Sequence, residues 1–457
     1  MRGRGLRPGP LDSARRDRGP GRGEPHPLRV RRPLKIFFQT FGCRVNQYET
    51  QALRERLLAD PSVEPAPDWE SADVCVVNSC TVTAEADKDA LRLVRRISRR
   101  NPGARIVVTG CLADRDAAAL AEAAPGALVV GNAGKGDIAA LLGFGAGPAG
   151  SHVSGLAGRS RALVKVQDGC DGACSYCVVP GVRRRFSSKP LAELSAEVAG
   201  LVAAGHAEIT LCGIRLGRYS GDDGRGGTAD LAGALEALAR LPGEFRLRLS
   251  SLEIAELSDR LIAASAGSGG RVCPSFHLPL QSGSDAVLKR MNRPYDAAFY
   301  AGRLSALRTS LPRAAVFSDV MAGFPGETEA EFRESVSFVK DMGLRGLHVF
   351  RYSSRPGTPA ASFPDQVRPE TALGRALVLR ALDRDLRTAA AKAAVFSTRR
   401  VVAVGTESLS EDFLPVLLDR DPGPGIHEVA VTSAVGPSCR GHLLVPGVDQ
   451  IYLSADK

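Results

Sequence analysis

The chain has 457 residues, of which 44% are hydrophobic and 24% charged, and its formal net charge is +10. This is globular composition, with enough length for two or three domains that each bury a core. No apolar run approaches the length of a membrane span and the start lacks the pattern of a secretory signal, so we expect a cytoplasmic protein without membrane partners. Ten cysteines in such a protein indicate metal ligands and small buried side chains rather than disulfides.

The positive charge is concentrated at the start of the chain. Residues 1–32 hold ten arginines against three acidic residues and carry few large apolar side chains. A mixture of Arg, Gly and Pro cannot bury enough surface to offset the entropy of ordering it. We therefore expect a disordered extension, which either helps to hold RNA electrostatically or has no function.

Residues 33–143 alternate between short apolar runs and helical patterns. The runs at 34–40, 73–80 and 104–111 are rich in Val, Ile and Phe, and the segments 49–60 and 87–100 between them are amphipathic. This β-α-β-α-β order predicts a parallel sheet covered by helices.

A cysteine follows each of these three predicted strands. Cys43, Cys80 and Cys111 lie at or just beyond the carboxyl ends, which meet at one edge of a parallel sheet, where ligands bind. Three separate buried cysteines would be an alternative, as for Cys75, which lies inside a strand where only packing is required. Taken together, the three loop cysteines favour a shared metal site.

A Gly-, Ala- and Ser-rich segment at 144–161 predicts a linker, and residues 162–395 then repeat strand and helix about six times. The expected strands are 162–167, 207–213, 245–250, 275–281, 316–324 and 346–353. Six such units predict an open, partial (βα)6 barrel with functional residues on the loops after its strands.

The loop after the first of these strands contains Cys170, Cys174 and Cys177. A cluster held by three protein thiolates leaves one iron free for an outside ligand. A zinc site would usually require a fourth Cys or His ligand nearby, and His206 and His277 are remote in sequence. A zinc knuckle or a chance spacing is the alternative.

Residues 396–457 form the last predicted unit. Four short runs, at 399–407, 413–420, 427–435 and 441–447, predict a small β-barrel. From Arg399 to Lys457 there are five basic residues against eight acidic ones, which is unfavourable for binding phosphates.

The C-x3-C-x2-C loop resembles the motif of the radical S-adenosylmethionine superfamily, with Tyr176 as the aromatic residue before the last cysteine. The resemblance implies that a 4Fe-4S cluster binds S-adenosylmethionine at its open iron and cleaves it to a 5′-deoxyadenosyl radical. Together with "FGCRVNQYET", "VVNSCTVTAEADK" and "VTGCLA", the chain resembles the methylthiotransferases, whose first domain holds a second 4Fe-4S cluster.

Later stretches follow the same family in order, among them "LCGIRLGRYSGD", "LRLSSLEIAEL", "HLPLQSGSDAVLKRMNRPY" and "DVMAGFPGETEAEF". By these matches Gly213, Ser251, Glu253 and Gln281 are candidates for the S-adenosylmethionine pocket. Each also has a structural interpretation, such as a turn for Gly213, a helix-cap acid for Glu253 and a core amide for Gln281. The last unit is by position similar to the family's RNA-binding (TRAM-like) barrel.

Among the branches of this family, "GCRVNQYET" and "NSCTVTAEADK" look most like the enzymes that add a methylthio group at C2 of N6-threonylcarbamoyladenosine beside the tRNA anticodon. That resemblance implies the tRNA anticodon stem-loop as substrate and an electron donor such as flavodoxin or ferredoxin. Isopentenyladenosine in tRNA and an aspartate of a ribosomal protein are the alternative substrates. Arg183, Arg184 and Arg185, where the family's Arg-Gly pair is altered, are candidates for facing RNA phosphates, or else form a solvated loop.

A protein of another class, a non-catalytic iron-sulfur or zinc scaffold that binds RNA, would need the cysteines but not the pocket loops. The intact "QSGSD" and "GFPGET" stretches argue against it.

Overall fold

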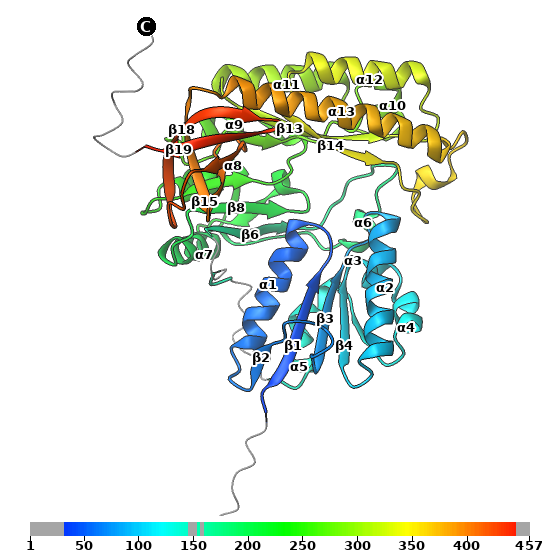
Figure 1. Cartoon of the computed structure of the whole chain (residues 1–457). Coiled ribbons are helices and arrows are strands. Elements are labelled where there is room, and N and C mark those ends of the chain that lie inside the picture. Colours follow the sequence, from blue (N-terminus) through cyan, green and yellow to red (C-terminus); the bar gives the residue numbers. More distant parts are fainter. Residues whose placement is uncertain (1–31, 145–152, 156–159, 445–457) are drawn as a thin grey trace, which may run out of the picture.

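The computed structural model describes residues 32–144, 153–155 and 160–444. They form a parallel α/β domain, a partial barrel of strands and helices, and a small closed β-barrel (Figure 1), which confirms the predicted fold class. The predicted disorder of the arginine-rich extension falls almost wholly outside these residues, as do most of the linker and the last thirteen residues of the final unit. None of the described helices is long and apolar enough to cross a membrane.

The N-terminal domain has a five-stranded parallel sheet in the order β2-β1-β3-β4-β5. Two of its strands were not predicted, because three residues each are too few to show an alternating pattern. The elements are β1 (Leu34–Thr40), α1 (Arg44–Leu58), β2 (Val63–Pro65), β3 (Val74–Ser79), α2 (Ala84–Arg100), β4 (Arg105–Gly110), α3 (Cys111–Arg115), α4 (Ala117–Ala123), β5 (Leu128–Val130) and α5 (Ile138–Leu141). The strand order reverses between β1 and β3, and ligands of open parallel sheets bind at such a point.

Alternate residues of β3 face opposite sides of this sheet. Val74 and Val76 pack in a core with residues of α1 and α5, whereas Cys75 and Val77 pack in a second core with residues of α2 and α4. The helices α1 and α2 therefore cover opposite faces of the sheet, as Figure 1 shows. Cys75 is a core residue, in agreement with its predicted packing role.

All six predicted strands of the middle domain are present, and neighbouring ones are parallel. They are β6 (Arg161–Asp168), β8 (Glu208–Gly213), β11 (Arg246–Leu249), β12 (Ser275–His277), β13 (Ala315–Ala322) and β14 (Gly346–Arg351). Hydrogen bonding splits them into sheets β11-β8-β6-β7 and β12-β13-β14, which parallel bridges at Leu247–Val272 and Ser251–His277 connect. The result is a curved, open barrel.

Eight α-helices and three short strands complete the middle domain as it is described, apart from three short 3-10 helices. They are α6 (Val179–Val182), β7 (Ser187–Ser188), α7 (Leu191–Ala203), β9 (Ser220–Asp222), β10 (Thr228–Asp230), α8 (Leu231–Ala239), α9 (Asp259–Ala266), α10 (Asp285–Arg290), α11 (Ala297–Ser310), α12 (Glu329–Asp341) and α13 (Pro369–Ala393). The longest, α13, leads to the last domain.

The last domain is a closed barrel of five strands rather than the four that were predicted. They are β15 (Thr398–Val404), β16 (Glu407–Ser410), β17 (Pro415–Leu418), β18 (Ile426–Val435) and β19 (Ser438–Leu443). The missed strand is β16, whose sequence "ESLS" resembles the turns that flank it. Val401, Val416 and Val429 fill the barrel together with residues of α13.

Candidate active site between two cysteine triads

The strand ends of the N-terminal sheet bring the first cysteine triad together. Cys43 lies between β1 and α1, Cys80 directly follows β3, and Cys111 directly follows β4. The approach is close, since a Cβ at Gly42 would lie only 2.7 Å from the sulfur of Cys80. Gly42 has a φ of 92°, so only glycine both fits this gap and adopts the backbone conformation without strain.

The thiols of this triad are close enough to influence one another. Burial raises the pKa of Cys80 to about 11, and the neighbouring Cys111 and Cys43 raise it further. Burial likewise raises the pKa of Cys43. Without a metal these two thiols stay protonated at neutral pH, so a metal that binds them must displace protons.

The second triad lies in the loop between β6 and α6. The backbone N–H of Cys177 donates to the carbonyl of Cys174 at 3.1 Å, and that of Gly172 donates to the sulfur of Cys170 at 3.3 Å. Tyr176, which directly precedes Cys177 in this loop, packs edge-on against the ring of Phe324. Burial raises the pKa of Cys177 to about 12, so this site too would bind a metal with loss of protons.

A cleft of about 330 Å³ opens beside this loop. Cys170 and Cys174 line it together with Ser251 and Glu253. Two of the predicted pocket residues are therefore brought next to the cysteines. The charged residues Asp171, Arg215, Glu253 and Arg293 are among those that line the cleft, and a zwitterionic ligand such as an amino acid moiety requires groups of both signs.

Arg293 is a cleft residue that the sequence did not indicate. Its guanidinium donates to the sulfur of Cys174 at 3.1 Å and forms an ion pair with Glu253, while its side chain is only 3% exposed. The direction of a single arginine side chain on a loop cannot be predicted from the sequence. It joins a predicted pocket acid to a predicted cluster ligand.

Ser251 is held by a chain of hydrogen bonds inside the barrel. Its hydroxyl lies 2.6 Å from Nδ1 of His277, and Nε2 of His277 lies 2.7 Å from Asp319. His348 approaches the same carboxylate at 3.3 Å. Burial alone would raise the pKa of Asp319, but the hydrogen bonds from the two histidines outweigh it and hold that pKa at about 2.

The other two predicted pocket residues lie beside the cleft but are not among the residues that line it. Gly213 ends β8, where a Cβ would come within 3.1 Å of the Gln167 side chain. Gln281 has a φ of 71°, and its backbone bridges to β13 through Asp319 and Met321. Gly213 therefore packs closely at a strand end, and Gln281 lies at a bend of the backbone, while their assignment to the pocket stays a prediction.

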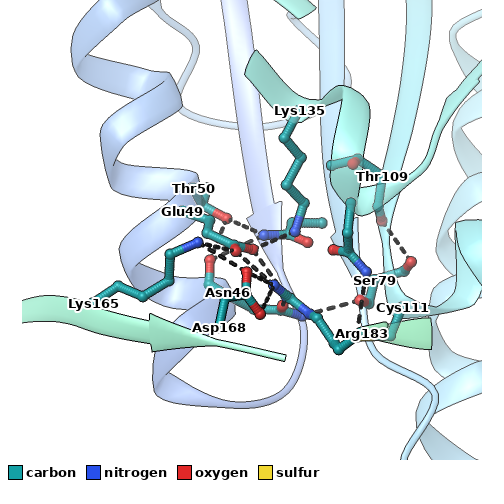
Figure 2. A network of polar contacts seen from close by, with 12 residues as sticks. Asn46, Glu49, Thr50, Ser79, Thr109, Cys111, Lys135, Lys165, Asp168 and Arg183 are labelled. Carbon is teal, nitrogen blue, oxygen red and sulfur yellow. Dashed lines mark hydrogen bonds and ion pairs between the residues drawn. The ribbon is translucent and has the colours of Figure 1, made fainter. Parts of the chain in front are cut away.

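A buried group of charges joins the two triad-bearing domains. Glu49 of α1 contacts Lys135, Lys165 and Arg183, and the last two also contact Asp168 at the end of β6. Figure 2 shows these side chains converging on Glu49 from both domains; we refer to them as the Glu49 network. Burial opposes ionisation of Glu49, but the three cations outweigh it and hold its pKa well below the usual value.

The structure corrects the predicted role of Arg183. Its side chain is 1% exposed and donates to Glu49, Asp168 and the Asn46 side chain, so it cannot face an RNA phosphate. Arg184 and Arg185 are exposed. A run of three arginines gives no indication from sequence that its first member turns inward.

Arg183 connects the surroundings of the two triads. Its backbone carbonyl accepts from the N–H of Cys170 at 3.1 Å, and its guanidinium holds Asn46. The amide of Asn46 in turn donates to the carbonyls of Phe41 and Ser79, next to the loops of Cys43 and Cys80. One arginine thus links the loop of one triad to the loops of the other.

A second junction lies on the other side of the interface. Arg355, in the loop after β14, pairs with Asp87 at the start of α2 and donates to Thr81 at 2.9 Å. The backbone N–H of Ala84 donates to the hydroxyl of Ser353 at 3.1 Å. The N-terminal domain therefore packs over the mouth of the partial barrel, at the ends of β6 and β14 (Figure 1).

Comparison with known proteins supplies the class. The profile of the uncharacterized protein family UPF0004 matches residues 35–131, and that of the radical SAM superfamily matches residues 164–339. In fold, the chain is similar to the radical S-adenosylmethionine methyltransferase TsrM from Kitasatospora setae, with a TM-score of 0.51 and 15% identity over 72% of this chain and 77% of that one.

Curated relatives are more similar in sequence than this structural neighbour. The threonylcarbamoyladenosine tRNA methylthiotransferase MtaB of Chlamydia pneumoniae is 38% identical over 71% of this chain and 76% of its own length. A tRNA-2-methylthio-N(6)-dimethylallyladenosine synthase of Erythrobacter litoralis is 34% identical over 77% of this chain and 83% of its own length. The chain belongs to the radical S-adenosylmethionine methylthiotransferase family, which confirms the resemblance inferred from its motifs. It is a transferase, and its cofactors are S-adenosylmethionine and 4Fe-4S clusters.

Proposed function

We propose that the protein inserts a methylthio group at C2 of N6-threonylcarbamoyladenosine at position 37 of tRNA. The observation that carries this proposal is the placement of two cysteine triads on loops that Arg183 ties together. Adenine C2 bears a C–H bond that no side-chain base could usefully deprotonate, so a radical source and a sulfur donor are both needed. The identity with a relative named for this nucleoside supports the choice of substrate.

We assign the two clusters to the two triads. Cys170, Cys174 and Cys177 would hold the cluster that binds S-adenosylmethionine, and Cys43, Cys80 and Cys111 would hold the second. The donor sets fit, since each comprises three cysteines without a fourth protein ligand among the described contacts, and the first set borders a cleft. When bound, the clusters and S-adenosylmethionine supply the radical and the sulfur chemistry.

The side chains around the cleft would bind its ligand and orient it. Arg293 offers a cation for a carboxylate beside Cys174, and Glu253 balances that cation when the cleft is empty of ligand. The hydroxyl of Ser251, oriented by His277, presents a further hydrogen-bonding group in the same cleft. The Glu49 network joins the two domains through buried ion pairs, which would hold the two triads in a fixed relative position.

The remaining partners follow from this chemistry. The tRNA anticodon stem-loop is the proposed substrate, a flavodoxin or ferredoxin the proposed electron donor, and the cytoplasm the proposed location. Arg184 and Arg185, exposed beside the cysteine loop, are proposed to contact the RNA near the reacting base.

Nucleoside analysis of bulk tRNA tests the proposal. A strain that lacks the protein should lose the 2-methylthio form of N6-threonylcarbamoyladenosine and accumulate the unmodified parent. The wild-type chain should restore the modified form, and Cys43→Ala should not. An unchanged level of that nucleoside in the deletion strain would refute the assignment.

The dimethylallyl relative supports one alternative substrate. In that case 2-methylthio-isopentenyladenosine would disappear from the deletion strain instead. The acidic last domain keeps a basic ribosomal protein as the other alternative, which a loss of methylthio mass from that protein would reveal.

A further inference from the structure

The solvent face of α2 carries a stripe of positive charge. Lys88, Arg92, Arg95, Arg96, Arg99 and Arg100 are all exposed. Their spacing places them on one side of the helix, while Ala90, Val94 and Ile97 on the other side are buried against the sheet. From Ala90 to Arg100 there are five arginines and no acidic residue. We call these six residues the α2 basic face.

Most of this charge has no partner within the protein. Lys88 and Arg92 form exposed pairs with Glu85 and Asp89, one turn back on the same helix. Among the described residues, Arg95, Arg96, Arg99 and Arg100 form no ion pair, so that the only ion pairs of the α2 basic face are those of Lys88 and Arg92. The helix dipole favours cations only in the last turn, which accounts for Arg99 and Arg100 but not for Arg95 and Arg96.

The stripe begins beside the candidate active site and leads away from it. Thr83, which caps α2, is three residues beyond Cys80, and the first N–H of the helix bonds to Ser353 of the partial barrel. Seventeen residues give α2 a length of roughly 25 Å. Figure 1 shows it on the outer side of the N-terminal domain, running from the domain junction to the far end of the sheet.

The last domain does not offer a comparable surface. Of its four described arginines, Arg399 pairs with Asp412 and Arg400 with Glu244, and six acidic residues lie between Thr398 and Leu443. Of these two surfaces, the α2 basic face therefore offers a polyanion more unpaired positive charge than the small β-barrel does.

We propose that the α2 basic face binds the phosphate backbone of the tRNA, along the stem that continues from the anticodon loop held at the barrel mouth. This inference rests on the proposed tRNA substrate. Contacts from a helix face to phosphates fix orientation without reading sequence, so the face would set how the stem lies and not which base reacts.

The test is a double variant that removes two positive charges, with a control that removes two charges elsewhere. Arg95→Gln/Arg99→Gln removes two exposed arginines one helical turn apart, and Arg380→Gln/Arg384→Gln removes two with the same spacing from the exposed face of α13. Both full-length variants are reconstituted with iron and sulfide, and tRNA affinity is measured from 50 to 300 mM salt.

The α2 variant should bind tRNA at least fivefold more weakly, and its plot of log affinity against log salt should be shallower by about two. The KM for tRNA should rise, whereas kcat, iron content and S-adenosylmethionine cleavage should stay unchanged. The α13 control should match the wild type in all of these. Equal losses in both variants, or no loss in either, would overturn the proposal. If the wild type itself neither bound nor modified tRNA, the proposed function would fail instead.

Discussion

The guanidinium of Arg183 donates hydrogen bonds to both carboxylate oxygens of Glu49, at 2.6 and 2.9 Å, across the boundary between the two triad-bearing domains. Arg183 follows the second triad closely in sequence, and Glu49 lies on the helix that begins next to Cys43. A bidentate arginine–carboxylate contact fixes direction as well as distance. The relative placement of the two proposed clusters is therefore set by a buried ion pair and not only by apolar packing.

Glu49→Gln should weaken this placement. The substitution removes the ion pair of Lys135 and leaves Lys165 and Arg183 with Asp168 alone, and uncompensated buried charge costs on the order of 3–5 kcal/mol. We expect a lower midpoint in chemical unfolding. We also expect more 5′-deoxyadenosine formed per methylthio product, because the clusters are held less firmly relative to each other.

Glu55→Gln is the control for this variant. Glu55 lies on the same helix, but it accepts hydrogen bonds from the neutral side chain of Gln51 and the backbone and hydroxyl of Ser154. Its loss should change the free energy of unfolding by no more than about 1 kcal/mol. It should also leave unchanged the amount of 5′-deoxyadenosine formed per methylthio product. Equal behaviour of the two variants would show that the Glu49 network has no positioning role.

Two separate 4Fe-4S clusters should be countable. Protein reconstituted without oxygen should bind about eight irons, as two clusters of four require. Changing Cys170, Cys174 and Cys177 together to Ala should remove about half, since the other triad lies on a different domain. Loss of all metal with either triad, or zinc in place of iron, would contradict the assignment of one cluster to each triad.

The two triads should differ in their effect on S-adenosylmethionine. Cys174 lines the cleft, so Cys174→Ala should abolish reductive cleavage to 5′-deoxyadenosine. Cys80 lies in the other domain, so Cys80→Ala should retain cleavage and lose sulfur insertion. Chromatography of 5′-deoxyadenosine and of the tRNA nucleosides distinguishes these outcomes, and the same loss of cleavage in both variants would refute the division of roles.

The sequence predicted the long elements and the cysteine positions well because both have local signals. Strands such as β13 show an apolar run, and Cys80 and Cys111 follow such runs directly, while the other triad cysteines lie in the loops that come after β1 and β6. Strands β2 and β5 were missed because three residues cannot show a period, and β16 because "ESLS" has the composition of a turn.

The direction of polar side chains was the least predictable property. Arg183 and Arg184 are adjacent arginines, yet one is buried in a network with residues more than 130 positions away and the other is exposed. Nothing local distinguishes them, because the partner that buries Arg183 is Glu49 of another domain. Arg293 was missed for the same reason, since its contacts with Cys174 and Glu253 exist only in the folded chain.

The junction between the partial barrel and the last domain should be sensitive to acid. Glu208 of β8 accepts from Arg246 and Arg248, whose guanidinium groups also donate to the carbonyls of Arg400, Leu409 and Ser410 in the small β-barrel.

Burial would raise the pKa of Glu208, but the charges and hydrogen bonds of Arg248 and Arg246 outweigh it and hold that pKa at about 2. A carboxylate whose pKa is lower when folded stabilises the protein above its unfolded pKa of about 4.5 and loses that contribution as the pH falls towards 2. The shift corresponds to roughly 3 kcal/mol.

Comparison of the wild type with Glu208→Gln over this pH range measures the effect and cancels any acid sensitivity that the two share. The variant should be less stable than the wild type by a constant amount above about pH 5, because the wild-type carboxylate is then fully ionised. The difference should shrink between about pH 4.5 and pH 2, as Glu208 of the wild type takes up a proton and becomes as neutral as glutamine. Glu407→Gln, at an exposed position on the same small barrel, should show no such dependence. A difference between wild type and Glu208→Gln that did not change with pH would mean that the two arginines are held by packing and backbone carbonyls, and not by the charge of Glu208.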